Sequence, residues 1–205
     1  MKLYYSPGAC SLAPHIALAE AGIAADTIKV DLSTHTTEDG TDYYSINPKG
    51  YVPLLELDDG TRLTEAAVVL QYIADRKPGK LAPPAGTLER WKLMEWLNFI
   101  ATEIHKGYGP LWHPEAIGEM AVASVKAQLQ KRYAIVEAQL AKTPFLTGGD
   151  FTIADAYLYT VTSWSGYLKV DLSAYAHLAA YMKRIAARPA VAQTLAAERK
   201  AKQPA

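Results

Sequence analysis

A segment rich in proline and glycine divides this chain in two. Residues 77–86 contain three prolines and two glycines, and neither an α-helix nor a central β-strand can continue through such a segment. We therefore interpret residues 78–86 as a linker between a first domain, residues 1–77, and a second domain, residues 87–205. A chain of 205 residues suits two small domains and is long enough to bury a core.

The first domain alternates segments typical of strands with segments typical of helices. Its expected strands are residues 2–5, 27–30, 52–57 and 62–63, and its expected helices are residues 11–21 and 65–76. Asp58-Asp59-Gly60, between the last two strands, is typical of a hairpin turn. This order of elements predicts a small α/β unit, with residues 33–41 as a loop.

The second domain has a helical pattern throughout. Apolar residues from Val122 to Leu140 recur every three or four positions, which predicts one long helix with a face toward the core. Residues 178–185 predict another helix, which Arg188-Pro189 ends or restarts, and the tail after Leu195 is expected to fray. Thr152 and Asp155 match a capping box at a further helix start, and we assign both to stability rather than to catalysis.

Charge and cysteine content argue against several classes of protein. The chain has 21 Lys plus Arg and 21 Asp plus Glu, so it lacks the basic excess typical of nucleic-acid binders and of proteins that attach to membrane surfaces. No apolar run approaches the roughly 20 residues of a membrane span, and Pro7-Gly8 interrupts the N-terminus before a signal peptide can form. The single cysteine, Cys10, cannot form an internal disulfide, which favours the reducing cytoplasm.

Motifs for several other chemistries are missing from the sequence. No GxGxxG follows a strand, no glycine-rich loop ends in Gly-Lys-Ser/Thr, and no GxSxG is present. The five histidines show no metal-ligand spacing. We therefore expect neither a metal nor a nucleotide cofactor.

Cys10 lies between the Pro7-Gly8 turn and the first expected helix. Backbone N–H groups and the positive end of the helix dipole favour a thiolate at such a position. The adjacent Ser11 can cap the helix or donate a hydrogen bond to a bound sulfur. The alternative interpretation of Cys10 is a small buried apolar residue.

The expected helix of residues 87–106 has two distinct faces. Leu93, Leu97, Ile100 and Ile104 share one face, which predicts contact with the core. Asn98, Thr102 and His105 lie on nearly the opposite face, together with Trp91, and their polar groups can reach one ligand. An ordinary solvated face with an incidental histidine explains the same pattern.

Two further features suit a ligand with peptide groups. A cis Val52-Pro53 bond would turn the backbone of Val52 toward an extended peptide, although a trans proline is commoner. Glu65 and Ala66 open a helix, where amides can hold a carboxylate and Glu65 can bind an ammonium group, unless they serve only as a cap. Together these features match glutathione. They offer donors for a carboxylate, an acid for an amine, a strand edge for peptide groups and a turn that stabilises a thiolate.

The chain resembles the bacterial beta class of the glutathione S-transferase family over nearly its whole length. The matching segments are residues 1–12, 47–53, 63–65, 96–106 and 151–157. This resemblance implies an α/β thioredoxin-like N-terminal domain followed by an all-α helical C-terminal domain. It also implies a homodimer that uses glutathione.

The resemblance assigns roles to individual residues. Val52-Pro53 would carry the cis bond that presents the cysteinyl backbone, Glu65 and Ala66 would hold the γ-glutamyl end, and His35 would lie near the glycyl end. The residues that would approach the sulfur from the second domain are Asn98, Thr102, His105 and Lys106. The chain departs from the usual pattern at Ala66, where many members have Ser, and at His35, where this class usually has Lys.

We expect a glutathione transferase that joins the glutathione thiol to a hydrophobic electrophile, with Cys10, Ser11 and His105 as catalytic residues. Tyr108, Trp112 and Trp164 are the expected lining of the electrophile pocket. A second hypothesis is a thiol-disulfide reductase or peroxidase that cycles through a mixed disulfide on Cys10. A third is a non-catalytic ligand carrier with the same fold.

Overall fold

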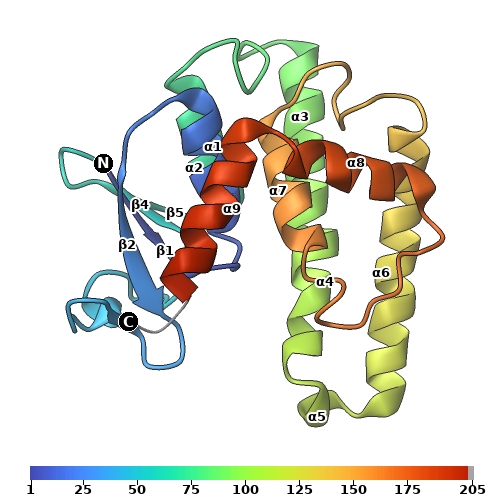
Figure 1. Cartoon of the computed structure of the whole chain (residues 1–205), viewed down its shortest axis with the longest axis horizontal. Helices are drawn as coiled ribbons and strands as arrows, with labels where there is room; N and C mark the ends of the chain where they lie inside the picture. Colours follow the sequence, from blue (N-terminus) through green and yellow to red (C-terminus); the bar gives the residue numbers. More distant parts are fainter. Residues whose placement is uncertain (203–205) are drawn as a thin grey trace. The chain divides into compact units, whose positions relative to one another are not determined.

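The computed structural model of the protein describes residues 1–202, and their contacts form two compact units (Figure 1). Among the described residues, unit one contains Met1–Ala82 and residues 187–202, and unit two contains Pro83–Ala186. The chain passes from unit one to unit two between Ala82 and Pro83, inside the expected linker of residues 78–86. The expected second domain, residues 87–205, differs from this finding, because residues 187–202 belong to unit one.

Unit one contains a mixed sheet of five strands in the order β3-β2-β1-β4-β5. The strands are β1 (Lys2–Tyr5), β2 (Asp26–Asp31), β3 (Thr36–Thr37), β4 (Leu54–Glu56) and β5 (Arg62–Thr64). β1 and β2 are parallel, as the helix between them requires, and the other pairs are antiparallel. The β4-β5 hairpin confirms the predicted turn. β3 was not predicted, since it occupies part of the expected loop at residues 33–41.

Helices pack on this sheet and on one another. The helical segments of unit one are α1 (Leu12–Ala21), η1 (Tyr43–Ser45), α2 (Ala66–Asp75) and α9 (Pro189–Lys202), and α1 contacts both α2 and α9. Gly22 ends α1 in the left-handed conformation, and its N–H donates to the carbonyl of Ala19. The thioredoxin-like arrangement expected for the N-terminal domain is confirmed.

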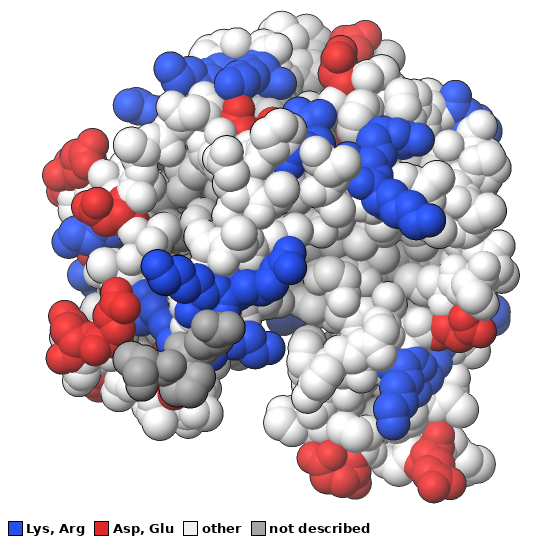
Figure 2. All heavy atoms as spheres, in the orientation of Figure 1, with Lys and Arg blue, Asp and Glu red and all other residues white. Residues whose placement is uncertain are grey.

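The last helix is held to unit one by polar contacts that the local sequence pattern does not reveal. Arg188 binds both carboxylate oxygens of Glu20, at 2.6 and 2.9 Å. Glu198 is buried and accepts hydrogen bonds from the Gly8 N–H and from His15 Nδ1, each at 2.8 Å. The expected fraying after Leu195 is wrong for the described residues, because α9 continues to Lys202. Figure 2 shows Lys and Arg gathered where α9 ends, and its last turn contains Arg199, Lys200 and Lys202.

Replacing Glu198 by alanine is expected to lower the free energy of unfolding by about 2 kcal/mol. The change removes the acceptor that joins the Gly8 turn and His15 to α9. Urea unfolding followed by circular dichroism measures the effect. The matched control is Gln193→Ala, an exposed residue of the same helix, which should leave stability nearly unchanged. Equal stability of the two variants would contradict an anchoring role for Glu198.

Unit two is helical. Its elements are α3 (Leu88–Phe99), the π-helical segment η2 (Ile100–His105), α4 (Lys106–Tyr108), the 3-10 segment η3 (Gly109–Trp112), α5 (Pro114–Ile117), α6 (Glu119–Leu140), α7 (Ile153–Thr162) and α8 (Ala176–Ala186). The predicted core face is confirmed, since Leu93, Leu97, Ile100 and Ile104 are buried. The expected continuous helix of residues 87–106 is interrupted by η2. Such π turns occur frequently at functional sites.

The predicted capping box is present at the start of α7. Asp155 Oδ2 accepts from the Thr152 N–H at 2.8 Å, and Asp155 Oδ1 accepts from the Leu146 N–H at 3.0 Å. The Tyr181 hydroxyl donates to Asp155 Oδ1 at 3.1 Å. Because α7 is buried along its whole length, these contacts fix the centre of unit two.

Two further findings concern the whole described chain. Over residues 1–202, no helix is long and apolar enough to cross a membrane. Within the same range, no three His, Cys, Asp or Glu side chains gather as a metal site would require.

Candidate functional site

Cys10 lies directly after a tight turn and two residues before α1 begins. The Ala9 N–H donates to the Ser6 carbonyl at 3.0 Å and closes this turn, in which Gly8 has a φ of +78°. The Cys10 thiol is half-buried and donates to the Val52 carbonyl at 3.1 Å. The thiol therefore lies beside the start of α1, as predicted, and has a polar partner from a segment 42 residues away.

Ser11 does not cap α1, which was one of its two predicted roles. Its hydroxyl makes no capping bond to α1. Instead, Oγ donates to the Ser6 carbonyl at 3.2 Å and accepts from the Ser6 N–H at 3.1 Å, in a buried position. The hydroxyl hydrogen is used inside the turn, so the geometry favours a role in shaping the Cys10 turn over donation to a bound sulfur.

Hydrogen bonds fix the segment that leads into the Val52-Pro53 bond, which is cis as the resemblance implies. The Tyr51 carbonyl accepts from the Tyr43 hydroxyl at 2.9 Å and from Asn47 Nδ2 at 2.7 Å. The next carbonyl, that of Val52, accepts the Cys10 thiol. Two parts of the predicted glutathione site, the Cys10 turn and the Val52-Pro53 segment, are therefore in direct contact.

Glu65 and Ala66 form the start of α2. Glu65 has a φ of +68°, a conformation that costs a residue with a side chain about 1–3 kcal/mol. Its side chain is 64 % exposed, and its Oε1 lies 2.9 Å from Lys49 Nζ. Ala66 is the first residue of the helix. The first backbone N–H groups of a helix can bind a carboxylate, so this corner holds both an acid and anion-binding amides.

His35 also has a left-handed backbone, with a φ of +53°. Its ring packs against the ring of Tyr44, with the two centroids 4.5 Å apart. The Tyr44 ring also lies so close to Gly50 that a Cβ at position 50 would be only 2.7 Å from a ring carbon. Among the described residues, His35 Nδ1 is a buried polar atom without a hydrogen-bond partner. Such an atom is costly, and a hydrogen bond to a ligand would offset that cost.

The predicted polar residues of unit two lie along α3, η2 and α4. Asn98, Thr102 and Lys106 are exposed, and the Thr102 hydroxyl donates to the Asn98 carbonyl at 3.0 Å. His105 is partly buried, and its Nδ1 lies 2.7 Å from the Tyr157 hydroxyl of α7. This contact orients the imidazole ring. Tyr157 is a functional candidate that periodicity did not reveal, although it ends one of the segments on which the resemblance rests.

Trp164 joins the aromatic residues predicted for the electrophile pocket. Its ring centroid lies 5.2 Å from that of His105, 5.8 Å from that of Tyr108 and 5.6 Å from that of Trp112. Trp112 is 43 % exposed and also packs on the exposed Tyr167, which sequence reasoning missed. These contacts define an aromatic cluster beside His105.

Tyr108 supports this aromatic cluster and does not line its surface. The residue has no exposed area, and its hydroxyl lies 3.0 Å from that of Tyr133. Burial raises the pKa of Tyr108 to about 12, which keeps the phenol neutral. The interpretation of Tyr108 as a pocket residue is therefore corrected, because a side chain covered on all sides cannot contact a substrate.

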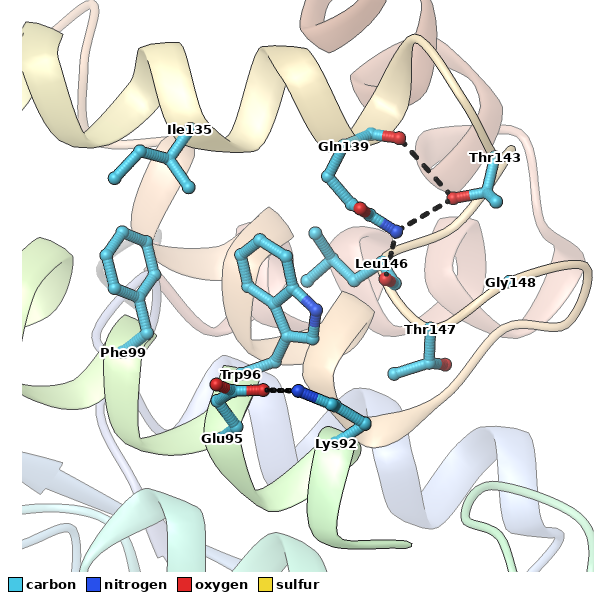
Figure 3. Close-up of a pocket in the computed structure, with 10 residues that line it drawn as sticks. All are labelled: Lys92, Glu95, Trp96, Phe99, Ile135, Gln139, Thr143, Leu146, Thr147 and Gly148. Atoms are coloured by element: carbon cyan, nitrogen blue, oxygen red, sulfur yellow. Dashed lines mark hydrogen bonds and ion pairs between the residues drawn. The ribbon is translucent and has the colours of Figure 1, made fainter. Parts of the chain in front are cut away.

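A separate cavity of about 510 Å³ lies between α3, α6 and the segment after α6 (Figure 3). Trp96, Phe99 and Ile135 form its apolar walls, and Lys92 and Glu95 pair with each other at 2.8 Å on its rim. None of the predicted site residues lines this cavity. Its lining combines these apolar side chains with the hydroxyls of Thr143 and Thr147.

Sequence matches cover both units. Residues 8–76 match the family described as "Glutathione S-transferase, N-terminal domain", and residues 99–189 match "Glutathione S-transferase, C-terminal domain". The chain is 48 % identical to "Glutathione S-transferase GstA" of Escherichia coli O157:H7 over 199 residues, which cover 97 % of this chain and 98 % of that protein.

Two solved structures are similar over nearly the whole chain. A sphingomonad glutathione S-transferase complexed with glutathione has 45 % identity and a TM-score of 0.92, and the match covers 97 % of this chain and 98 % of that one. The bacterial beta-class glutathione S-transferase of Sphingomonas chungbukensis also has 45 % identity, with a TM-score of 0.91 and the same coverage.

Proposed function

The chain belongs to the glutathione S-transferase family, and we propose that it joins the thiol of glutathione to electrophilic, mainly apolar small molecules. The observation that carries this proposal is the contact between the Cys10 thiol and the Val52 carbonyl beside the cis bond to Pro53. This contact joins a helix start, which favours a thiolate, to a backbone segment suited to a peptide ligand.

In this proposal, unit one binds the tripeptide. The Val52 backbone pairs with the cysteinyl residue of glutathione, Glu65 and the amides at Ala66 bind the γ-glutamyl end, and His35 hydrogen-bonds the glycyl end. The partnerless Nδ1 of His35 and the positive φ of Glu65 support these roles, because both are costly features that a bound ligand would explain.

Unit two then supplies the groups that act at the sulfur. His105 hydrogen-bonds the glutathione thiol and receives its proton, with Tyr157 holding the ring. The thiolate attacks an electrophilic carbon, a carbon–sulfur bond forms, and the leaving group departs with the bonding electrons. Asn98, Thr102 and Lys106 supply polar contacts beside the sulfur. The exposed Trp112, which packs on the buried Trp164, offers an apolar surface to the electrophile.

Conjugation of glutathione to a chloronitrobenzene, followed by absorbance, tests this function. Wild-type protein should give a rate that saturates with glutathione, and a rate equal to that without protein would contradict the proposal. Cys10→Ala should keep most of this rate, because the attacking sulfur is that of glutathione. Loss of turnover in Cys10→Ala, together with a glutathione adduct on wild-type Cys10 in mass spectra, would instead favour the disulfide chemistry.

Family membership also supports three wider proposals. The protein forms a homodimer, acts in detoxification and works in the cytoplasm. Sedimentation of the purified chain tests the first of these, and a monomer at micromolar concentration would contradict it. The presence of one cysteine, which needs no oxidising compartment, supports the last.

A further inference from the structure

Lys49 is held beside Glu65 by a turn with defined hydrogen bonds. The buried Asn47 accepts the Lys49 N–H on its side-chain oxygen at 3.2 Å and the Gly50 N–H on its carbonyl at 2.8 Å. Its side-chain amide donates to the Tyr51 carbonyl at 2.7 Å. The backbone of Lys49 is therefore fixed to the same segment that carries the cis Val52-Pro53 bond.

The ammonium group of Lys49 reaches the junction of β5 and α2. Its Nζ lies 2.9 Å from Thr64 Oγ1 and 2.9 Å from Glu65 Oε1. Glu65 pairs with this cation from a backbone that has the costly φ of +68°. An acid and a base thus lie side by side at the start of α2, where the proposed γ-glutamyl end of glutathione binds.

The γ-glutamyl end of glutathione is itself a zwitterion, with an ammonium and a carboxylate on one carbon atom. Its ammonium suits Glu65, which leaves its carboxylate in need of donors. Ala66 has no side-chain donor. At the start of α2, the carboxylate can therefore be bound only by the first backbone N–H groups of the helix. Lys49 is the cation already paired with Glu65.

We propose that Lys49 binds the α-carboxylate of the γ-glutamyl group while Glu65 binds its ammonium, so that Lys49 selects for substrates with an intact α-amino acid end. The proposal rests on the proposed function and adds a residue that determines specificity. On binding, the pair between Lys49 and Glu65 is exchanged for two pairs with the ligand. Lys49 thereby supplies a contact that Ala66 cannot.

A matched pair in the same unit separates this role from that of a surface salt bridge. Lys2 is 49 % exposed, as Lys49 is, and its Nζ lies 3.1 Å from Glu56. Because Lys2 lies on β1 and takes no part in the proposed site, Lys2→Gln controls for the loss of one exposed ion pair.

The test measures conjugation kinetics of Lys49→Gln and Lys2→Gln. Lys49→Gln should raise the KM for glutathione about three- to fivefold with little change in kcat, whereas Lys2→Gln should leave both constants unchanged. With 4-aminobutyryl-cysteinyl-glycine, which keeps the ammonium and lacks the α-carboxylate, the two variants and the wild type should have equal KM values. Adding Ala66→Ser to Lys49→Gln should lower the KM again, because the new hydroxyl donates to the same carboxylate.

Equal KM values for glutathione in Lys49→Gln and Lys2→Gln would overturn the inference. The same holds if the effect of Lys49→Gln persists with the analogue. Neither result affects the proposed function as long as the wild-type protein turns over glutathione. Absence of wild-type turnover would contradict the proposed function itself, so the two failures are distinguishable.

Discussion

Replacing Asp155 by alanine is expected to lower the free energy of unfolding by about 4 kcal/mol. The carboxylate is fully buried and accepts from the N–H groups of Leu146 and Thr152 and from the Tyr181 hydroxyl. Alanine leaves these donors inside unit two without that acceptor. Urea unfolding measures the loss, and Thr152→Ala, which removes a single hydroxyl from the same box, should lose less.

The exposed Asp150 provides the matched control, because Asp150→Ala removes an equal side chain five residues away. Its stability should stay within about 0.5 kcal/mol of the wild type. If Asp155→Ala were as stable as Asp150→Ala, the capping box would contribute nothing, and the assignment of Asp155 to stability would be wrong.

The Asp155 carboxyl is also expected to make the stability of the protein depend on pH. Burial raises the pKa of Asp155 above its ordinary value of 3.8, and hydrogen bonds from Leu146, Thr152 and Tyr181 oppose the rise. The folded chain then binds this proton more readily than the unfolded chain does. The part of the stability that comes from binding this proton is therefore lost as the pH rises through the folded pKa, and it returns as the pH falls toward 3.8. The stability difference between wild type and Asp155→Ala should grow in that direction.

Replacing His105 by asparagine is expected to lower kcat for conjugation about a hundredfold, because the imidazole is the proposed acceptor of the thiol proton. Tyr157→Phe keeps the ring contact but removes the hydroxyl that lies 2.7 Å from His105 Nδ1. We expect about a tenfold loss from that variant, with a shifted pH profile of kcat, since the imidazole stays in place but is oriented less well.

His113→Asn is the control for His105→Asn. The His113 side chain is 79 % exposed and lies 3.6 Å from Glu115 at the surface of unit two. Its replacement should leave kcat and KM unchanged. Equal rates for the two histidine variants would remove His105 from the mechanism, and an unshifted pH profile in Tyr157→Phe would remove Tyr157 as a positioning residue.

Features set by short stretches of sequence were predictable. The β4-β5 hairpin follows from Asp58-Asp59-Gly60 between apolar runs, and the capping box follows from the spacing of Thr152 and Asp155. The position of Cys10 next to a helix start follows in the same way from Pro7-Gly8 and the pattern after it. In each case, the residues that determine the structure are neighbours along the chain.

Features that depend on distant partners were not predictable. α9 belongs to unit one because Glu198 meets Gly8, 190 positions away, and no local pattern records that contact. Ser11 turns to Ser6 rather than to α1 because the closed turn places backbone groups within its reach. The π-helical segment η2 also escaped prediction, since its apolar residues Ile100 and Ile104 fit an α-helical spacing.

The same limit applied to the candidate site. Glu65 and Ala66 were recognisable as a helix start, whereas the pairing of Glu65 with Lys49 depends on the turn around Asn47. His105 stood out on its helix face, but its partner Tyr157 comes from another helix. Sequence alone thus pointed to candidate groups for the chemistry more readily than to the groups that orient them.

Calorimetric titration with S-methylglutathione, which binds without reacting, tests the central claim most directly. If unit one holds the tripeptide through Val52, Glu65 and the start of α2, the wild type should bind one ligand per chain, and Glu65→Gln should bind it about tenfold more weakly. Absence of binding by the wild type, or equal affinity in Glu65→Gln, would contradict the account.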